Sequence, residues 1–596
     1  EFNQSPTSKW PVYATVGVFA GIALMMLIPW PAVMNSMRPN ERMKQFDFYT
    51  AGKIPTQFGG RVMPLDAYAR QTLKAISNRE SLSLDTAPKE IQDHTTGRSV
   101  SAMQWLMEVA TDDPSLHDLP MFRIDAEEVR SELGLERRKS KLYSLNEIRE
   151  QWDEASKLVE AAGKKEAIHQ SFKEKKLIEL DRRTRQYTLT AAAFRIPTPS
   201  RFPDSFFPEG TSEQDRQMFA IRELEMRMES LAKMPAPAVI PPAENVADES
   251  VDNPKWSAYA PAFFDMVKNS LGTGATPQPS IETFGEISKA YSDMDTVGFN
   301  TAVDEHLAAV QSYEIPGYDK GTVSLERWMQ SNWPTGVTMF LYLVSTVLAL
   351  FYFLFHLPRM RQAVWGTLAI ALAIHTFTIL CRVAITGRAP VINLYSSAVF
   401  IGWAAVLFGL VVERIFKYGT GNLLSAFAGM MSLLVAYGLN TGDTMPVLQA
   451  VLDTQFWLAT HVISVTLGYV ATLVAGTLGI GYLLAGWVGK DSKAMKDLYR
   501  MCYGAACFGI LFSFVGTVLG GLWADDSWGR FWGWDPKENG ALLIVIWNAL
   551  MLHARWDGMV KARGFCVLAI GGNIVTTWSW FGTNELGIGL HSYGFT

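Results

Sequence analysis

The carboxyl-terminal part of the chain is dominated by apolar stretches that are long enough to cross a lipid bilayer. A helix rises about 1.5 Å per residue, so roughly 20 apolar residues span the hydrocarbon core. By this criterion the sequence predicts eight spans after Trp333, at approximately 335–357, 364–386, 395–415, 421–438, 458–487, 503–521, 540–556 and 564–582. A further apolar stretch runs from Val12 to Pro29, and we interpret residues 1–34 as an amino-terminal anchor. The expected fold class is an all-α polytopic membrane protein with about nine transmembrane helices.

The density of charged residues separates this membrane part from the rest of the chain. Residues 335–596 contain about 10% charged side chains, whereas residues 1–334 contain about 25%. The first figure is too low for a soluble fold, and the second is ordinary. We therefore expect a mostly helical, water-exposed domain at 35–334 and a multi-helix membrane domain at 335–596. The Pro- and Ala-rich segment at about 234–254 predicts a linker that divides the water-exposed domain into two lobes.

Basic residues are distributed unevenly over the predicted loops. If the amino terminus is cytoplasmic, most Lys and Arg residues fall in inner loops, and the outer loops hold little beyond Arg388, Arg530 and Lys537. By the positive-inside rule, the domain 35–334, the loop 522–539 and the carboxyl terminus then lie on the outer side of the membrane. Membrane lipid is an expected partner. The net charge of −5 offers no basic surface for nucleic acid, which we exclude as a partner.

Several cysteine and histidine residues, which could bind a metal or react, do not form a recognisable site in the sequence. The four cysteines lie in apolar runs, and their spacing matches neither a disulfide framework nor a zinc site. We expect them to be packing residues. Four histidines of the water-exposed domain are isolated, and we expect each to be a solvated polar residue: His94, His117, His169 and His306.

The predicted loop 522–539 carries an unusual concentration of tryptophan. It reads LWADDSWGRFWGWDPKEN and holds four indoles within 12 positions: Trp523, Trp528, Trp532 and Trp534. An interfacial belt also places Trp at headgroup depth, but a belt spreads over many helix ends and needs no glycine or acid at fixed spacing. Here Gly529 and Gly533 allow a tight surface from which flat rings project, and Asp535 begins the segment that ends the loop. The pattern predicts a surface for a large planar aromatic ligand.

The segment WGRFWGWDPKE resembles the tryptophan-rich WWD signature of the haem-handling proteins. That family includes the cytochrome c synthases of system II and the haem lyase components of system I. Other segments are similar to the CcsA/ResC type of system II synthase: RVAITGRAPVINLYSS, WLATHVISVTLGYV, ALMLHARW and GIGLHSYGF. The resemblance covers about residues 364–596. QFGGRVMPLDAYAR resembles the extra outer domains of some larger bacterial members, without a motif to which we can assign a role.

The resemblance implies that His461 and His591 hold the iron of haem b on the outer face, over the tryptophan surface with Asp535. Both histidines are predicted on the same membrane side as the tryptophan loop, and two imidazoles can supply both axial ligands. His553 falls in the inner part of the predicted span 540–556, where a polar side chain is costly and usually functional. The family implies that His553 holds haem on its way across the membrane. The second ligand would come from a companion membrane subunit or fused half of the ResB/CcsB type.

Two further histidines are in-chain candidates for the partner of His553, namely His375 in mid-span and His356 at an inner helix end. Their predicted depths match His553 poorly. Lys537 and Arg530 are candidates to pair with haem propionates. No residue is predicted to act as a catalytic acid or base, and the most plausible role of Asp535 is to fix the loop.

The chemistry implied by the family is thioether attachment of haem to the Cys-x-x-Cys-His motif of apocytochrome c. The chain would be a holocytochrome c synthase, or haem lyase, component that binds and presents haem. The alternatives are a haem- or quinone-binding membrane transporter or electron carrier, and a haem chaperone of system I. The last is disfavoured because the carboxyl-terminal segment is more similar to system II. The sequence leaves open whether the protein also moves haem across the membrane.

Overall fold

The chain forms two compact units. The membrane unit contains residues 1–28, 332–440 and 444–596, and the inserted unit contains residues 29–331 together with 441–443. The computed structural model describes residues 10–586 and residue 589, apart from the gaps at 84, 86–88, 90–91, 93–98, 112–113, 167–168, 204–205, 209–210, 243–254, 273–277, 314, 316, 356, 358 and 490–491. Each unit is described by itself below.

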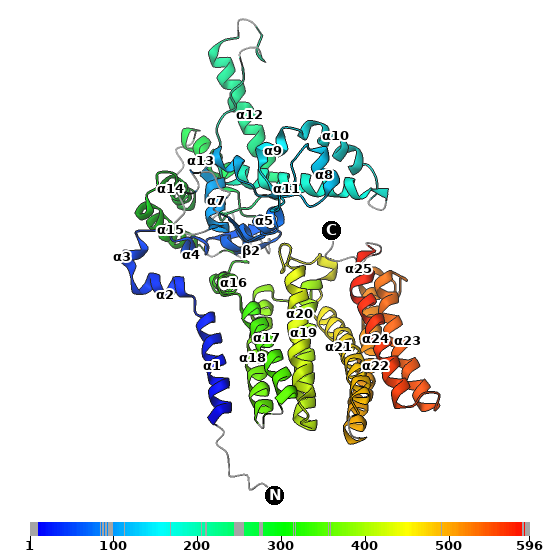
Figure 1. The fold of residues 1–596 in the computed structure, drawn as a ribbon. Helices are drawn as coiled ribbons and strands as arrows, with labels where there is room; N and C mark the ends of the chain where they lie inside the picture. The colour runs from blue at the N-terminus through cyan, green and yellow to red at the C-terminus, as the bar shows by residue number, and fades with distance from the viewer. Residues whose placement is uncertain are drawn as a thin grey trace. The chain divides into compact units, whose positions relative to one another are not determined.

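Long helices make up the membrane unit (Figure 1). They are α1 (Trp10–Leu27), α17 (Pro334–Phe355), α18 (Met360–Thr386), α19 (Leu394–Phe416), α20 (Thr420–Leu439), α21 (Gln455–Trp487), α22 (Ser492–Trp528), α23 (Pro536–Trp556) and α24 (Ala562–Thr577). From α17 to α24 each long helix is followed along the chain by the next, so neighbours in this series run in opposite directions, whereas the inserted unit separates α1 from α17. The predicted class, an all-α polytopic membrane protein, is confirmed.

The number of spans differs from the expected nine. Seven of the described helices are long and apolar enough to cross a membrane. The count reaches eight if α1 and α2 (Trp30–Met37), which meet at a bend of 68°, form one span. The helix α23 is not among the seven, although it has 21 residues. Polar side chains such as Asn548, His553 and Arg555 lower its mean hydropathy.

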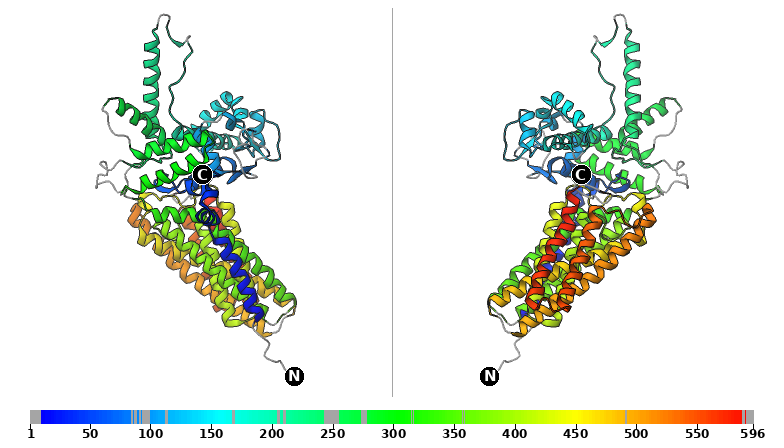
Figure 2. Two further views of the ribbon diagram at one scale, coloured as in Figure 1. Left: turned by 90° about the vertical axis from the view of Figure 1, so that its left-hand side faces the viewer. Right: turned by 90° about the vertical axis from the view of Figure 1, so that its right-hand side faces the viewer.

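The helices of the membrane unit pack in two groups that share one apolar core. One group consists of α1, α17, α18, α19 and α20, and the other consists of α21, α22, α23 and α24. The views in Figure 2 show these helices side by side along their length. Glycines bring α21 and α22 into backbone contact. A Cβ atom on Gly468 would lie 2.6 Å from the amide nitrogen of Ser513, and one on Gly516 would lie 2.5 Å from that of Val465. Small residues of this kind let membrane helices approach closely.

The inserted unit is mostly helical, with three two-stranded antiparallel sheets. Its sheets pair β1 (Pro55–Phe58) with β2 (Arg61–Pro64), β3 (Ser81–Ser83) with β4 (Ser99–Ser101), and β5 (Phe122–Arg123) with β6 (Leu142–Tyr143). Its longer helices are α5 (Leu65–Ser77), α7 (Ala102–Thr111), α10 (Trp152–Gly163), α11 (Phe172–Phe194), α12 (Glu213–Lys233), α13 (Tyr259–Gly272), α14 (Pro279–Ser292), α15 (Thr296–Gln311) and α16 (Lys320–Asn332).

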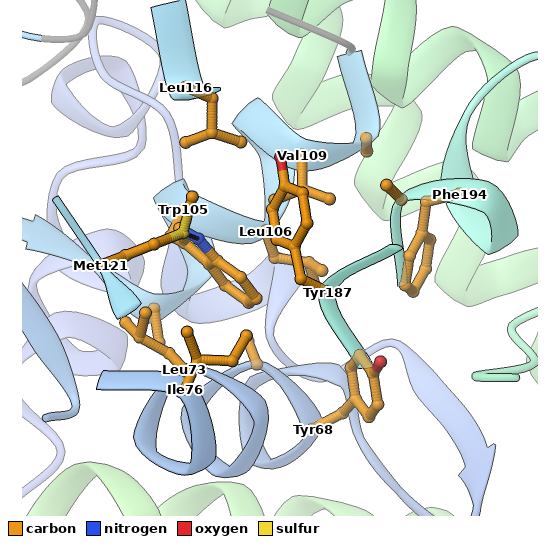
Figure 3. Close-up of a cluster of buried hydrophobic side chains, with 14 of the residues drawn as sticks. Tyr68, Leu73, Ile76, Trp105, Leu106, Val109, Leu116, Met121, Tyr187 and Phe194 are labelled. Carbon is orange, nitrogen blue, oxygen red and sulfur yellow. Dashed lines mark hydrogen bonds between the residues drawn. The ribbon is translucent and has the colours of Figure 1, made fainter. Parts of the chain in front are cut away.

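One apolar core extends through the inserted unit from Ala51 to Val303. Figure 3 shows part of it, where Trp105 of α7 lies beside Met121 and near Leu73 of α5. The indole N–H of Trp105 donates to the sulfur of Met121 at 3.4 Å. This core contains residues from both sides of the segment predicted as a linker, and two smaller clusters of buried residues lie in the same unit.

The first part of the segment predicted as a linker contains buried apolar residues. Val239 and Ile240 are buried in this core, and the backbone of Ala238 pairs with that of Gln57 in β1. Residues 234–242 are therefore part of the folded unit. The remainder of the predicted linker, residues 243–254, lies outside the described residues.

The histidines of this unit differ in exposure. His306 on α15 is completely buried, which corrects the expectation that it is solvated. Its Nδ1 lies 3.0 Å from the hydroxyl of Thr283, and its ring packs against Phe284. Burial lowers the pKa of His306 from 6.5 to about 4. His169 is exposed as expected, His117 is partly buried, and His94 lies outside the described residues.

Candidate functional site

Two of the four tryptophans predicted in a loop lie on a helix. The helix α22 continues to Trp528, so Trp523 and Trp528 project from its last turns. It ends at Gly529, which has a φ of 67° and whose amide donates to the carbonyl of Asp525 at 2.8 Å. Between residues 522 and 528 no proline or glycine interrupts the helix, which explains why it extends further than predicted. The loop proper is therefore 529–535.

His461 lies on the second turn of α21 and faces the end of α22. Its Nδ1 lies 2.7 Å from the carbonyl oxygen of Gly516. A carbonyl only accepts, so Nδ1 carries the proton and the lone pair of the neutral ring is on Nε2. The imidazole lies 5.7 Å from the ring of Trp523, centroid to centroid. The hydrogen bond at Nδ1 fixes the orientation of the imidazole, as the outer partners of histidine ligands do in metal sites.

Gly520 determines how closely α22 approaches this imidazole. A Cβ atom at Gly520 would lie 2.5 Å from Cε1 of His461. Any side chain at this position would therefore displace the ring. The close approach of α21 and α22 at Gly468 and Gly516, described above, is what brings His461 and Trp523 together.

The loop 529–535 holds the other two tryptophans in an open arrangement. The rings of Trp532 and Trp534 meet edge to face, with centroids 6.3 Å apart and an interplanar angle of 84°. Trp534 has a φ of 58° and is 70% exposed. Left-handed backbone at a bulky residue is uncommon and costs conformational energy, and such positions cluster at functional sites.

Asp535 has a structural role at the start of α23. Its carboxylate accepts the backbone amides of Lys537 and Glu538, at 3.0 and 2.9 Å. Glu538 in turn accepts the amides of Asp535 and Gly533. This reciprocal cap satisfies amides that the first turn of a helix leaves unpaired, and it fixes the loop to the helix.

Lys537 does not have the environment expected of a propionate ligand. Its ammonium group donates to the carbonyl oxygens of Ser579 and Trp580, at 3.2 and 3.1 Å. These carbonyls belong to the π-helical segment Trp578–Gly582, which follows α24. Lys537 therefore joins α23 to the carboxyl-terminal end of the chain. Arg530 is exposed, and its guanidinium lies over Gly533, where a Cβ atom would come within 2.3 Å of it.

A cavity of about 100 Å³ lies between α21, α22 and the loop. Its walls include three of the predicted tryptophans and His461, together with residues that the sequence interpretation did not single out: Tyr469, Phe531 and Glu538. Tyr469 lies eight residues after His461, and this helical spacing places both on one face, a signal that was available in the sequence. Its hydroxyl lies 3.0 Å from that of Ser579.

The remaining predicted histidines lie apart from this cavity. His553 is exposed on the last turns of α23, with its ring edge-on to Trp556 at 5.8 Å. His375 is buried in α18 and lies 3.0 Å from the hydroxyl of Tyr342. The helix α18 packs with α1, α17, α19 and α20, whereas α23 packs with α21, α22 and α24, so the packing does not support a pair between His375 and His553.

His591 and His356 lie outside the described residues. Gly589, two positions before His591 in the sequence, packs against the loop: a Cβ atom there would lie 2.7 Å from Cβ of Asp535. Gly589 has a φ of 91°, so a side chain at this position would be strained as well as crowded.

Comparison with known proteins identifies the family. Residues 391–591 match the family model described as cytochrome C assembly protein, a range that contains the tryptophan loop together with His461, His553 and His591. The chain is 30% identical over 271 residues to the cytochrome c biogenesis protein CcsA of Prochlorococcus marinus (strain MIT 9313), covering 38% of this chain and 84% of that protein. The chain belongs to the CcsA family. It is therefore a multi-pass membrane protein of cytochrome c biogenesis.

Other relatives extend the same result. CcsA of Chlamydomonas reinhardtii is 29% identical over 261 residues, covering 40% of this chain and 69% of that protein. Protein NrfI of Wolinella succinogenes is 30% identical over 236 residues, which cover 38% of this chain and only 25% of NrfI. CcsA membership implies that cytochrome c is the class of substrate and that haem is handled.

Proposed function

We propose that the membrane unit binds haem b at the surface formed by α21, α22 and the loop 529–535, and presents it for attachment to apocytochrome c. The observation that carries this proposal is the geometry of His461. Its Nδ1 is bonded to the carbonyl of Gly516, and its ring lies beside Trp523 at the wall of the cavity. His461 and His591 are the proposed axial ligands, and Trp523, Trp528, Trp532 and Trp534 form the proposed platform, which Asp535 holds in place.

The size of the cavity determines how haem is bound in this proposal. Ligand sites usually measure about 300–1,000 Å³, so a cavity of about 100 Å³ does not enclose a whole porphyrin. Only one edge of the ring enters between α21 and α22. The rest lies across the exposed side of the loop, where Phe531 and Trp534 offer apolar surface. An open position of this kind leaves the vinyl edge accessible to a polypeptide substrate.

The proposed reaction joins each thiol of a Cys-x-x-Cys-His motif to one vinyl group of haem. A carbon–sulfur bond forms, and the thiol proton ends on the other vinyl carbon, so the addition needs no further reactant. The residues of this chain act by holding haem in one orientation, which converts the encounter of thiol and vinyl into a positioned reaction. The histidine of the substrate then replaces one imidazole on the iron, and the product leaves.

The proposal also includes a second haem position at His553 and an orientation of the chain in the membrane. His553 is exposed near the end of α23 that lies opposite the loop, which supports a second haem position whose other ligand comes from a ResB/CcsB-type subunit. We propose that residues 35–334, the tryptophan site and the carboxyl terminus lie on the periplasmic side of the inner membrane. The uneven distribution of Lys and Arg supports this orientation.

Replacement of the proposed ligands tests this function. His461→Ala and His591→Ala should each abolish cytochrome c maturation while the amount of inserted protein stays unchanged. Added imidazole should restore part of the activity, because it occupies the empty coordination position on iron. Normal maturation by both variants would remove the assignment of the two ligands.

A second variant tests the inner position separately. His553→Ala should lower the haem that copurifies with the complex of this chain and its ResB/CcsB-type partner, while the outer-site variants should retain more. A normal haem content together with normal maturation in His553→Ala would make His553 a structural residue.

A further inference from the structure

A second cleft, far along the helices from the tryptophan site, lies between the start of α18 and the end of α19. It measures about 310 Å³ and is lined by Arg361, Gln362, Trp365, Glu413, Arg414 and Lys417. The helices alternate in direction, so this end of the membrane unit is the one opposite the loop 529–535. The proposed haem chemistry makes no use of these residues.

The floor of this cleft is the buried carboxylate of Glu413, which accepts hydrogen bonds from three groups. The side chain of Glu413 is 1% exposed and accepts the guanidinium of Arg361 at 2.9 Å. It also accepts the backbone amides of Gly419, which precedes α20, and of Gly421, in the first turn of α20. A buried carboxylate is stable only with such partners, so Glu413 balances the charge of Arg361 and holds it at the edge of the cleft.

Two more cations of the cleft have no such balance. Arg414 and Lys417 are exposed, and within the described part of the chain neither side chain has a hydrogen bond or an ion pair. Lys417 caps α19 with a φ of 61°, and its backbone amide donates to the carbonyl of Glu413. The cleft therefore presents two uncompensated positive charges. The dipole of α19 alone stabilises cations at its carboxyl-terminal end. This stabilisation does not explain why the two cations line a cleft between two helices.

The surface that flanks the cleft is apolar. Trp365, in the wall, is 38% exposed, and Val411 and Ile415, on the last turns of α19, are 51% and 65% exposed. In a membrane span such residues face acyl chains, and tryptophan prefers the depth of the headgroups. The cleft thus has a positively charged end beside an apolar side. An amphiphile with a phosphate headgroup requires both.

We propose that the cleft between α18 and α19 binds the phosphate headgroup of an anionic phospholipid, with its acyl chains against Trp365 and the exposed face of α19. Arg414 and Lys417 pair with the phosphate, and Arg361, held by Glu413, borders it. Basic pockets between membrane helices bind anionic headgroups through the same chemistry. The lipid then occupies a fixed position at the membrane end opposite the tryptophan site.

The full chain, purified in detergent, allows a direct test by native mass spectrometry with added phosphatidylglycerol or phosphatidylcholine. The unaltered protein should retain phosphatidylglycerol about tenfold more tightly than phosphatidylcholine, and the double variant Arg414→Gln/Lys417→Gln should lose this preference. The charge-preserving variant Arg414→Lys/Lys417→Arg should keep it. The matched control is Lys561→Gln/Arg563→Gln, which removes two exposed cations at the start of α24, at the same end of the bundle.

Three results would overturn the proposal. The double variant could keep the preference for phosphatidylglycerol, or the control could lose it equally, which would make the effect one of general surface charge. In the third case, inorganic phosphate without lipid would raise the melting temperature of the protein as much as phosphatidylglycerol does. The cleft would then be a site for a free anion.

Discussion

At the scale of single residues, two glycines near the proposed haem site differ in what an added Cβ atom would contact. A Cβ atom at Gly533 would meet only the end of the flexible, exposed Arg530 side chain, which can move away. A Cβ atom at Gly520 would meet the imidazole of His461, which packs beside Trp523 and is bonded to Gly516. The glycine within the helix is therefore expected to be the more sensitive of the two.

The first prediction follows from this difference. Gly520→Ala should lower the haem content of the purified protein about tenfold, because a displacement of the ring by less than 1 Å disturbs a fitted site. Gly504→Ala is the matched control, since it lies on the same helix with open space around its Cβ position. Haem content is measured from the absorption of equal amounts of inserted protein. Equal haem content in both variants would argue against His461 as a ligand held by α22.

The second prediction distinguishes a haem platform from an interfacial belt of tryptophan. Trp534→Ala and Gly533→Leu should both lower bound haem with unchanged abundance in the membrane, whereas Gly533→Ala should retain most of it because Arg530 moves aside. A belt would tolerate all three, since anchoring is shared with many aromatic residues at helix ends. Unchanged haem content in Trp534→Ala and Gly533→Leu would favour the belt.

At the scale of elements, Lys537 connects the start of α23 to the π-helical segment Trp578–Gly582. A π-helix shifts the register of backbone hydrogen bonds and often marks a functional position. The sequence did not suggest this role, because a lysine near an aromatic loop resembles a ligand for anions. Only the packing of α23 on the segment after α24 brings two carbonyls to its ammonium group.

The third prediction concerns this connection. Lys537→Met should destabilise the carboxyl-terminal segment by about 1–3 kcal/mol, the usual cost of leaving buried polar groups without a partner. Amide hydrogen exchange should then accelerate in residues 578–585, and Lys561→Met, at an exposed position, should leave it unchanged. The same exchange rates in both variants would show that Lys537 does not hold this segment.

Sequence patterns predicted the helices better than their ends. The spans were visible as apolar runs, and the candidate site residues were chosen as tryptophan and histidine in a family motif. The end of α22 was missed because residues 522–539 were interpreted as one loop between two predicted spans, although no residue at 522–528 breaks a helix. The burial of Val239 and Ile240 was missed because proline dominated the interpretation of that segment, whereas their packing depends on partners far away in sequence.

At the scale of the whole molecule, the inserted unit contains a buried histidine that couples its folding to pH. Burial holds the pKa of His306 at about 4 in the folded state, below the ordinary value of 6.5. The unfolded chain therefore binds more protons between these two values, and stability falls as the pH is lowered from about 6.5 to 4. Above about pH 6.5 this effect is absent.

The fourth prediction is the size and place of this effect. Acidification to pH 4 should cost about 3 kcal/mol through His306, which corresponds to the shift of its pKa. Hydrogen exchange in α14 and α15 of the full chain should accelerate over this range. His306→Gln should weaken the pH dependence, while His169→Gln, at an exposed position, should not change it. An unchanged dependence in His306→Gln would assign the acid sensitivity to other groups.

The proposed function depends on haem bound at the tryptophan site with His461 as an axial ligand. The most direct measurement is the absorption spectrum of the purified chain, coexpressed with a ResB/CcsB-type partner, before and after His461→Ala. The unaltered protein should show the spectrum of haem with two histidine ligands. The variant should show the spectrum of haem with one histidine ligand, and added imidazole should restore the first spectrum. An identical spectrum and haem content in the two proteins would contradict the proposed function.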